Sequence, residues 1–335
     1  MRIIVPMAGR GSRLRPHTLT TPKPLLPVAG KPIVERLVED IAGIYGGPID
    51  EIVFIIGDFG EKVEQQLKQV AERLGSTGTI AYQDKPLGTA HAIQCAGDAL
   101  NDELIIAFAD TLFRADFTLD RQKDGAIWVK EVEDPRAFGV VTVNEQGAIS
   151  GMVEKPETPV SNLAIIGIYY VKDGAALKAE IQHLLDNDIK SKGEYQLTDA
   201  LENLRNKGKV FVPGKVEDWM DCGNKSNLLS TNRSVLGYLH RDKKLQTPEA
   251  DPANGVIIHP PCFIHPATQL ADCIVGPHVS IGEGSQVKNA VVKNSIIQNY
   301  ASVTNTVLED SIVSNYAQAA PQPRVVNLGD FSAMD

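Results

Sequence analysis

A glycine-rich segment near the start of the chain holds the residues best suited to binding an anion. It reads Met7-Ala8-Gly9-Arg10-Gly11-Ser12-Arg13-Leu14-Arg15-Pro16 and is followed by a proline-rich stretch that begins at Thr21. Glycines let backbone N–H groups turn toward an anion, and Arg13 and Lys23 add positive charge. Such a segment would suit a polyphosphate. A solvated glycine-rich turn is the alternative that these residues alone leave open.

The spacing of the glycines excludes two other nucleotide-binding motifs. Leu14 stands where the dinucleotide-binding fingerprint has its third glycine, and the chain contains no G-x-x-x-x-G-K-[ST] sequence. Any phosphate would therefore be bound by a loop of a different kind.

Taken with other motifs, this segment resembles the signature of the sugar-1-phosphate nucleotidylyltransferases, in particular the glucose-1-phosphate thymidylyltransferases. The stretch TPKPLLPVAGKP at 21–32 continues the signature. The other motifs follow in the family's order: Gln83 with PLGTA at 86–90, Asp110 at the end of an apolar run, FGV at 138–140, EKP at 154–156, GIY at 167–169, EYQLTD at 194–199 and WMDCG at 219–223. Many members have one more glycine in the first loop, and the shorter loop with Arg10 and Ser12 bears on the choice of nucleotide.

The resemblance implies a reaction and its catalytic residues. In this family an oxygen of a sugar 1-phosphate attacks the α-phosphorus of a nucleoside triphosphate and displaces pyrophosphate. Arg13 and Lys23 would face the triphosphate, while Asp110 and Asp221 would hold Mg²⁺ with oxygen ligands at the edge of the sheet. No general base is needed, because the sugar phosphate is already ionised. Taken alone, each aspartate could equally be a helix cap or a turn residue.

The resemblance also assigns the residues that would bind the substrates. Gln83 offers an amide whose donor and acceptor match the N3–H and a carbonyl of thymine or uracil, and Gly88 has no Cβ to obstruct a base. Lys155 would hold the sugar phosphate and Glu154 the sugar hydroxyls, with a surface ion pair as the simpler role for Glu154. The expected nucleotide-binding residues are Ala8, Gly9, Gly11, Ser12, Arg13, Gln83, Gly88 and Thr89. The expected sugar-phosphate-binding residues are Gly139, Glu154, Lys155, Asn162 and Tyr169, of which Tyr169 could instead be a packing residue.

The pattern up to about Gly223 predicts the elements that would position these residues. Short β-branched runs alternate with amphipathic stretches, which is typical of an α/β fold with a mainly parallel sheet, and the resemblance implies a Rossmann-like nucleotidyltransferase domain over residues 1–235. A helix is predicted over Glu61–Leu74, and others begin near Lys31, Gly88, Gly174 and Gln196. The predicted strands are Ile3–Pro6, Glu51–Gly57, Thr79–Gln83, Leu104–Asp110, Ala126–Val132, Gly139–Asn144 and Ile165–Val171.

A different pattern follows the polar, proline-containing connection at 236–254. Over residues 255–318 an aliphatic residue recurs every five or six positions, which resembles the hexapeptide repeat of left-handed parallel β-helices. A β-sandwich is the alternative, but its period of two would not keep this spacing. The expected core residues are Ile258, Ile264, Leu270, Val275, Ile281, Val287, Val292, Ile297, Val303, Leu308 and Val313, and the corners suit Gly276, Gly282, Gly284, Asn294, Asn299 and Asn315. Residues 319–335 would form a tail.

The composition limits the classes of partner. The 335 residues include 33 basic and 42 acidic residues, and the resulting net charge of -9 argues against general binding to nucleic acid or to a membrane surface. The chain has no run of about 18 apolar residues, which a membrane-spanning helix would need. The four cysteines lack C-x-x-C spacing, and the first residues do not match a signal peptide. We therefore expect a cytoplasmic homo-oligomer, because so few coils cannot bury their own faces.

Together these features predict an Mg²⁺-dependent enzyme that makes a nucleotide sugar, from dTTP before UTP and from glucose 1-phosphate. A uridylyl-, guanylyl- or cytidylyltransferase of the same mechanism is an alternative. A catalytically silent subunit that binds a nucleotide sugar is another. An acyltransferase centred on His259, His265 or His278 is disfavoured, because such sites need more coils than this repeat supplies.

Overall fold

The computed structural model describes residues 1–9, 11–115 and 119–321, which form two compact units. The N-terminal unit contains Met1–Leu26 and Lys31–Asn227. The C-terminal unit contains Pro27–Gly30 and the described residues from Leu228 onward. Helix α6 (Lys225–Arg241) therefore lies mostly in the C-terminal unit, whereas the sequence pattern placed the end of the first region at residue 235.

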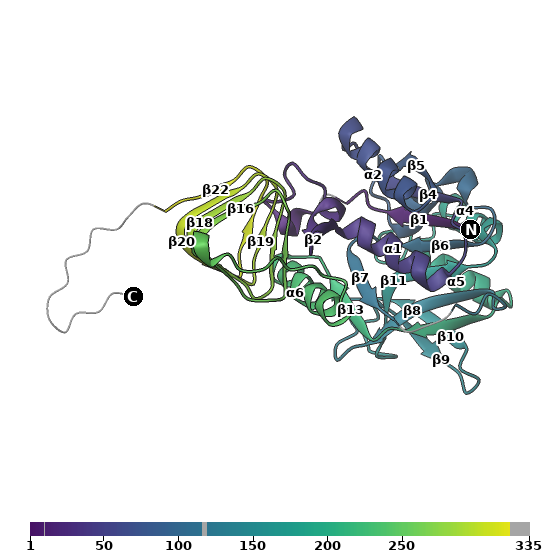
Figure 1. Cartoon of the computed structure of the whole chain (residues 1–335). Coiled ribbons are helices and arrows are strands. Elements are labelled where there is room, and N and C mark those ends of the chain that lie inside the picture. The colour runs from purple at the N-terminus through teal and green to yellow at the C-terminus, as the bar shows by residue number, and fades with distance from the viewer. Residues whose placement is uncertain (10, 116–118, 322–335) are drawn as a thin grey trace. The chain divides into compact units, whose positions relative to one another are not determined.

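A mixed sheet runs through the N-terminal unit. Its strands follow the order β10-β9-β11-β6-β1-β4-β5, and β8 pairs with β11 and β12 beside this path (Figure 1). Strands β5, β4, β1 and β6 run parallel, as do β8 and β12. Strand β11 is antiparallel to β6, β8 and β9, and β10 is antiparallel to β9. The bounds are β1 (Arg2–Pro6), β4 (Glu51–Ile56), β5 (Thr77–Tyr82), β6 (Leu104–Ala107), β8 (Gly125–Glu131), β9 (Gly139–Val143), β10 (Ile149–Glu154), β11 (Leu163–Val171) and β12 (Phe211–Lys215).

Helices cover the parallel part of this sheet. Helices α3, α4 and α5 contact one another and share a hydrophobic core with the sheet. In β1 the side chain of Ile4 belongs to this core, and that of Ile3, which points to the opposite face, is also fully buried. Both faces of β1 are therefore covered, as expected in a parallel sheet. The helices are α1 (Ile33–Tyr45), α2 (Glu61–Arg73), α3 (Thr89–Gln94), α4 (Gly174–Asp186) and α5 (Leu197–Asn206), with 3₁₀ turns at Ser12–Leu14, Lys23–Leu25 and Gly97–Ala99.

The structure confirms every predicted strand and adds several that the pattern does not reveal. The run predicted as Leu104–Asp110 ends as a strand at Ala107, so Asp110 lies just beyond it. Strand β10 escaped prediction because Gly151 interrupts it at a point where its register against β9 shifts. The paired strands β7 (Thr111–Arg114) and β13 (Asp218–Asp221) are each too short to show an alternating pattern. No membrane-spanning helix occurs in the part of the chain that the structure describes.

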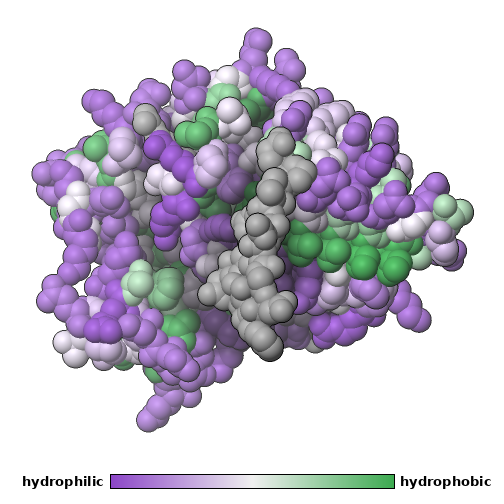
Figure 2. All heavy atoms as spheres, turned by 90° about the vertical axis from the view of Figure 1, so that its left-hand side faces the viewer, coloured by the Kyte–Doolittle hydropathy of each residue, from purple (hydrophilic) through white to green (hydrophobic). Residues whose placement is uncertain are grey.

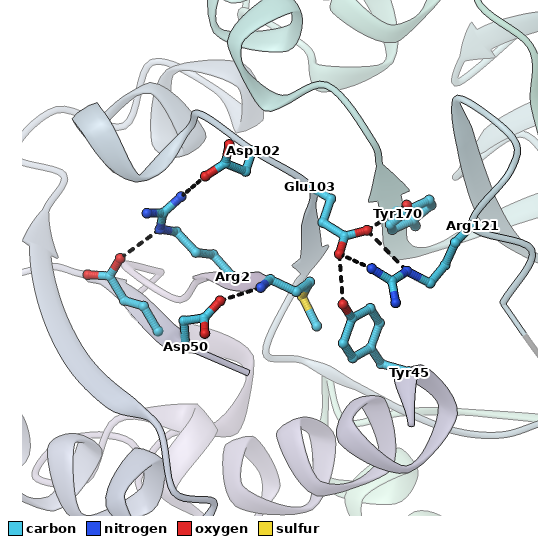
Figure 3. A network of polar contacts seen from close by, with 9 residues as sticks. Arg2, Tyr45, Asp50, Asp102, Glu103, Arg121 and Tyr170 are labelled. Carbon is cyan, nitrogen blue, oxygen red and sulfur yellow. Dashed lines mark hydrogen bonds and ion pairs between the residues drawn. The ribbon is translucent and has the colours of Figure 1, made fainter. Parts of the chain in front are cut away.

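Glu103 organises a polar network at the amino end of the sheet (Figure 3). Its carboxylate accepts hydrogen bonds from the hydroxyls of Tyr45 at 2.7 Å and Tyr170 at 2.9 Å. The Arg121 guanidinium donates to the same carboxylate and lies 4.9 Å from the centre of the Tyr45 ring. Burial raises the pKa of Glu103, but the hydrogen bonds from the three donors outweigh burial and lower the pKa below its ordinary value. The carboxylate thus joins the end of α1 to the end of β11.

A second set of ion pairs continues along the same edge (Figure 3). Arg2, at the start of β1, donates to Glu51 at 3.1 Å and to Asp102 at 3.2 Å. The ammonium group of Met1 pairs with Asp50 at 2.5 Å. These contacts hold β1, β4 and the segment before β6 together at the end of the sheet opposite to the carboxyl ends of its parallel strands.

The C-terminal unit is a parallel β-helix. One of its sheets consists of β14 (Val256–Ile258), β16 (Gln269–Val275), β18 (Gln286–Lys293), β20 (Ser302–Glu309) and β22 (Gln318–Ala319), and the other of β15 (Cys262–Ile264), β17 (Val279–Ile281), β19 (Ile296–Ile297) and β21 (Ile312–Val313). Val256 pairs with Cys273 and Ser302 with Gln318, so one coil takes 17 or 16 residues. Every aliphatic residue predicted for the core belongs to it, with Ile258, Leu270 and Leu308 partly buried.

Residues with positive φ form the three corners of the coils. They are Asp272, Asn289 and Asn305 at one corner, His278, Asn294 and Asp310 at the second, and Gly284, Tyr300 and Tyr316 at the third. The predicted corner residue Gly276 also has a positive φ, at 105°, whereas three other predicted corner residues do not. Of these, Asn299 and Asn315 accept hydrogen bonds from the backbone of the preceding coil, each at 3.0 Å. Gly282 is needed for space, since a Cβ there would lie 2.3 Å from Asn299 Oδ1. The sequence therefore located the corners but not the role of each residue in them.

We predict that Glu103→Ala lowers the free energy of unfolding of the chain by about 2–3 kcal/mol. The substitution leaves the hydroxyls of Tyr45 and Tyr170 and the Arg121 guanidinium without their charged acceptor. Urea unfolding followed by circular dichroism measures the change. Because the folded pKa of Glu103 is lowered, its contribution is present above the ordinary carboxyl pKa and is lost as the pH falls through the folded value. Asp102→Ala is the matched control, since it removes only a surface pair worth less than about 1 kcal/mol. Equal losses in the two variants would contradict the prediction.

Candidate active site

The carboxyl ends of the parallel strands create a crevice beside β1. β4 lies on one side of β1 and β6 on the other, so the chain leaves β1 in one direction and returns in the other. Ligands of open α/β sheets bind at such a switch point, because the loops that follow the two strands diverge there. The loops concerned are the glycine-rich segment after β1 and the segment containing Asp110 after β6.

A cavity of about 410 Å³ occupies this crevice. All the predicted nucleotide-binding residues line it, together with Lys23 and Asp110. Phe108 and Glu194, which sequence reasoning did not single out, also line it. Arg10, to which the shortened loop drew attention, lies outside the described residues. The structure thus gathers the glycine-rich loop, one predicted metal ligand and the predicted base-reading amide around one space.

Gly9 and Gly11 of this loop are glycines for different physical reasons. Gly11 adopts a φ of 60°, and a Cβ there would lie 2.9 Å from the Cβ of Lys23. The carbonyl of Gly11 accepts a hydrogen bond from the Thr18 hydroxyl at 2.7 Å, which fixes the loop. Gly9 has open space around its missing Cβ, on the side of the cavity. Gly11 is therefore required by the protein, and Gly9 leaves room for a ligand.

Lys23 is a buried cation aimed at the site. Its residue is 8% exposed, and its ammonium group lies 3.2 Å from Asp110 Oδ2. The Asp110 side chain is 51% exposed, so its carboxylate still faces solvent. A buried lysine held beside a half-exposed carboxylate places one positive and one negative group at the mouth of the same cavity. Both are then available to an anionic ligand and its counterion.

The short ladder between β7 and β13 brings Asp221 beside Asp110. Asp221 pairs with Thr111, and the N–H of Cys222 donates to the carbonyl of Asp110 at 2.9 Å. The Asp221 carboxylate accepts hydrogen bonds from Gly223 N–H at 2.8 Å and from the Asn227 amide at 2.5 Å. A Cβ on Gly223 would lie 2.9 Å from Asp221 Oδ1 and 3.3 Å from a guanidinium nitrogen of Arg13. The carboxylate and Arg13 therefore border the same turn.

An aromatic pair supports this ladder. The indole N–H of Trp219 donates to the Thr111 hydroxyl at 3.0 Å, and the Trp219 ring meets Phe138 edge-to-face at 5.0 Å between ring centres. Thr111 directly follows Asp110. The motifs that contain Phe138 and Trp219 are distant in sequence, but both contribute contacts that stabilise the β7–β13 pair.

The residues predicted to read the base, Gln83 and Gly88, line the same cavity, and the structure corrects the role of Gly88. Gly88 has a φ of 123°, and a Cβ there would lie 2.4 Å from the carbonyl oxygen of Tyr195. The missing Cβ is therefore required by the protein backbone rather than by a base. The Thr89 hydroxyl donates to Gln196 at 3.0 Å and accepts from Leu197 N–H at 2.9 Å, so it joins the start of α3 to that of α5.

Glu154 and Lys155, the consecutive residues predicted to bind the sugar and its phosphate, form an ion pair. The Glu154 side chain is 13% exposed and accepts a hydrogen bond from the Thr198 hydroxyl at 2.9 Å, while Lys155 Nζ lies 3.6 Å from its other oxygen. A Cβ on Gly139 would lie 2.8 Å from Glu154 Oε2, so Gly139 makes room for this carboxylate rather than for a hexose. The low exposure of Glu154 distinguishes it from an ordinary surface ion-pair residue.

The structure separates the two remaining sugar-site residues. Tyr169 is buried, meets Phe108 edge-to-face at 6.3 Å, and has a pKa raised first by burial and then by the charge of Glu154. Tyr169 therefore lies beside the group predicted to bind the sugar. Asn162, in contrast, is exposed, donates to Glu131 at 2.6 Å and lines a separate surface hollow with Glu133. The structure does not bring Asn162 to the others.

Several residues that hold or line the site were not singled out from the sequence, because no pattern in it indicates their side-chain contacts. Thr198 positions Glu154, and Asn227 positions Asp221. Glu194 contributes a carboxylate to the cavity wall. The EYQLTD and WMDCG motifs contain or adjoin all three, so the resemblance pointed to the segments without giving the contacts.

Comparison with known proteins places the chain in a class. A model of the nucleotidyl transferase family matches residues 3–237, and the chain belongs to this family. The predicted resemblance is thereby confirmed, and the relatives define it further. The low-salt glycan biosynthesis nucleotidyltransferase Agl11 of Haloferax volcanii is 30% identical over 90% of this chain and 89% of its own length. The glucose-1-phosphate thymidylyltransferase of Streptomyces antibioticus is 29% identical over 91% of this chain and 89% of its own length.

A solved structure agrees with the fold. UDP-glucose pyrophosphorylase in complex with UDP-glucose superimposes with a TM-score of 0.57 and 25% identity, over 71% of this chain and 98% of the other.

Proposed function

We propose that the protein transfers a nucleotidyl group from a nucleoside triphosphate to a sugar 1-phosphate and releases pyrophosphate. The observation that carries this proposal is the single cavity lined by the glycine-rich loop, the Lys23–Asp110 pair and the Gln83 amide. Such a cavity offers groups for the phosphates and the base of a nucleoside triphosphate, and a carboxylate for the counterion of the phosphates. Relatives that are named for nucleotidyl transfer to sugar phosphates support the same reaction.

The reaction needs positioning and charge stabilisation more than acid–base chemistry. The attacking oxygen belongs to a phosphate that is ionised at neutral pH, so no side chain has to remove a proton. Arg13 and Lys23 would stabilise the negative charge that moves toward pyrophosphate, and Lys155 would offset the charge of the incoming sugar phosphate. Glu154, held by Thr198, would orient the sugar through its hydroxyls.

The donor groups fit a magnesium ion. Asp110 has a half-exposed carboxylate, and Asp221 is held beside it by the β7–β13 ladder. Mg²⁺ is usually bound by one or two carboxylates together with substrate phosphates, and no cluster of three or more ligating side chains occurs among the described residues. Asp110 and Asp221 would hold the ion, which when bound neutralises phosphate charge.

For the substrates we propose dTTP before UTP as donor and glucose 1-phosphate as acceptor. A relative named for thymidylyl transfer to glucose 1-phosphate and a similar structure that holds UDP-glucose support a pyrimidine donor. The margin between dTTP and UTP should be small, because the two differ only by a methyl group and a ribose hydroxyl, and one methyl group in an apolar pocket discriminates by only about 1–3 kcal/mol.

A grid of nucleoside triphosphates and hexose 1-phosphates tests the proposal. We expect pyrophosphate release only when both substrates are present, with the highest kcat/KM for dTTP and glucose 1-phosphate. Preferred consumption of GTP or ATP would overturn the pyrimidine assignment and leave the transfer reaction standing. No release with any pair would overturn the transfer reaction itself.

We predict that Asp110→Asn and Asp221→Asn each lower kcat by about 10²–10³-fold or more, because each replaces a charged carboxylate by a neutral amide that holds Mg²⁺ less well in the transition state. Initial rates with varied Mg²⁺ measure the effect, and thermal unfolding confirms that the variants fold. Asp218→Asn, on the same strand as Asp221, is the matched control and should retain activity. Full activity of the Asp110/Asp221 double variant, or of the protein in excess chelator, would refute the metal assignment.

The proposed setting is the cytoplasm, without nucleic acid or membrane partners. Cys95, Cys222, Cys262 and Cys273 are free thiols, which suits a reducing compartment. The net charge of -9 disfavours polyanionic partners.

We also propose that the protein is a homo-oligomer that associates through its β-helix. Ile257, Ile274, Val291 and Val307 pair in register across β14, β16, β18 and β20 and point outward. Val307 is 74% exposed and Ile257 48%. Figure 2 shows one larger contiguous area of apolar side chains beside smaller separate ones. An aligned column of exposed aliphatic side chains would be buried by a second copy that presents the same column.

We expect Val307→Glu to shift the protein toward monomers, because a charge in the middle of an apolar contact is costly to bury. Light scattering after size-exclusion chromatography measures the mass. Gln286→Glu adds the same charge to an exposed position of β18 outside the column and should leave the mass unchanged. An unchanged mass for Val307→Glu, or a monomeric parent protein, would argue against this interface.

A further inference from the structure

The Gln83 side chain uses its amide nitrogen twice. Gln83 follows β5, where its backbone N–H donates to the carbonyl of Ile56 at 2.9 Å. Its Nε2 lies 3.3 Å from the carbonyl oxygen of Gly88 and 3.2 Å from Nδ1 of His91. The side chain is half-buried and lines the cavity described above.

The Gly88 carbonyl fixes which end of this amide points where. A carbonyl oxygen only accepts hydrogen bonds, so it must face the amide nitrogen and not Oε1. The nitrogen carries two hydrogens, and the second is directed at His91. His91 Nδ1 must then be an acceptor, which requires a neutral imidazole whose proton is on Nε2. Among the described residues Oε1 has no hydrogen-bond partner, so it is the atom of Gln83 left for a ligand.

The surroundings of His91 favour the neutral ring. Burial, followed by the positive charge of Lys85, lowers the pKa of His91 below its ordinary value. The nearby Cys95 thiol donates to the His91 carbonyl at 3.3 Å, and its pKa is raised by burial and then by the charge of Asp84. Glu194 is exposed and lines the cavity. Within the described part of the chain no carboxylate forms an ion pair with the His91 ring.

We propose that His91 is a positioning residue for base selection, which rests on the nucleotidyl transfer proposed above. By accepting an N–H of Gln83, His91 holds the amide with Oε1 toward the nucleotide cavity. That oxygen selects a base whose pairing edge presents a ring N–H, as thymine, uracil and guanine do. Cytosine and adenine present a ring nitrogen with a lone pair at that place and are disfavoured.

This assignment changes which hydrogen-bonding groups Gln83 has available for the base. The sequence suggested that Gln83 uses both a donor and an acceptor on thymine or uracil. Both N–H groups are already used within the protein, so only the acceptor remains, and the carbonyl of the base must find its donor elsewhere. A flipped amide would set Oε1 against the Gly88 carbonyl and against a lone pair of His91, which opposes the exchange.

The experiment measures discrimination as the ratio of kcat/KM for UTP to that for CTP. His91→Leu removes the acceptor, and we expect the ratio to fall about five- to tenfold, mainly through KM for UTP, with kcat changed less than twofold. His91→Asn supplies Oδ1 in place of Nδ1 and should keep the ratio. In a Gln83→Ala background, which has lost the amide, His91→Leu should change the ratio no further.

A pH profile separates positioning from packing. Between about pH 7.5 and pH 5 the parent protein should lose discrimination as His91 gains a proton on Nδ1, which then opposes the Gln83 N–H. His91→Asn does not titrate and should keep its ratio over the same range. An unchanged ratio in His91→Leu, an equal fall in the Gln83→Ala background, or the same pH profile for the parent and His91→Asn would each overturn the proposal. Absence of activity with every triphosphate in the parent protein would instead reject the transfer reaction.

Discussion

The hydrogen-bonded ladder between β7 and β13 is the contact on which the rest of the site depends. It joins the segment after β6 to a segment that the chain reaches only after the antiparallel part of the sheet is complete. The bond from Cys222 N–H to the Asp110 carbonyl extends this ladder by one residue and brings the backbones of the two aspartates together. Two carboxylates that approach each other repel unless a cation lies between or beside them. Lys23 pairs with Asp110, and Arg13 borders the turn that holds Asp221.

Polar contacts at the amino ends of the strands stabilise the sheet that carries this site. Glu103 and Arg2 fasten the amino ends of the strands, so that the carboxyl ends are free to carry irregular loops. Those loops accept backbone conformations that a regular strand would not, such as the φ of 60° at Gly11 and 42° at Lys155. Rigidity at one end of the sheet thus permits an irregular, preorganised site at the other.

Local signals in the sequence were enough for much of the fold. Alternation and β-branched runs located the strands, and the spacing of aliphatic residues located the β-helix core, because both patterns arise within a few residues of one another. Roles that depend on distant partners could not be obtained in this way. Gly88 is a glycine because of Tyr195, and Gly139 because of Glu154, and neither spacing nor composition contains that information. Asn162 shows the same limit, since its amide is engaged by Glu131 on a neighbouring strand.

The coil length of the β-helix has a consequence for how this chain tolerates changes in length. Equivalent residues of successive coils differ by 16 or 17 positions, and each coil contacts only its neighbours. Duplication or loss of one whole coil would keep every corner and every core position in its column, whereas deletion of a single residue within a side would turn all later side chains of that coil out of place. Descendants of this sequence could therefore lengthen or shorten the β-helix in steps of a coil without any change in the sequence of the unit that contains the cavity beside β1.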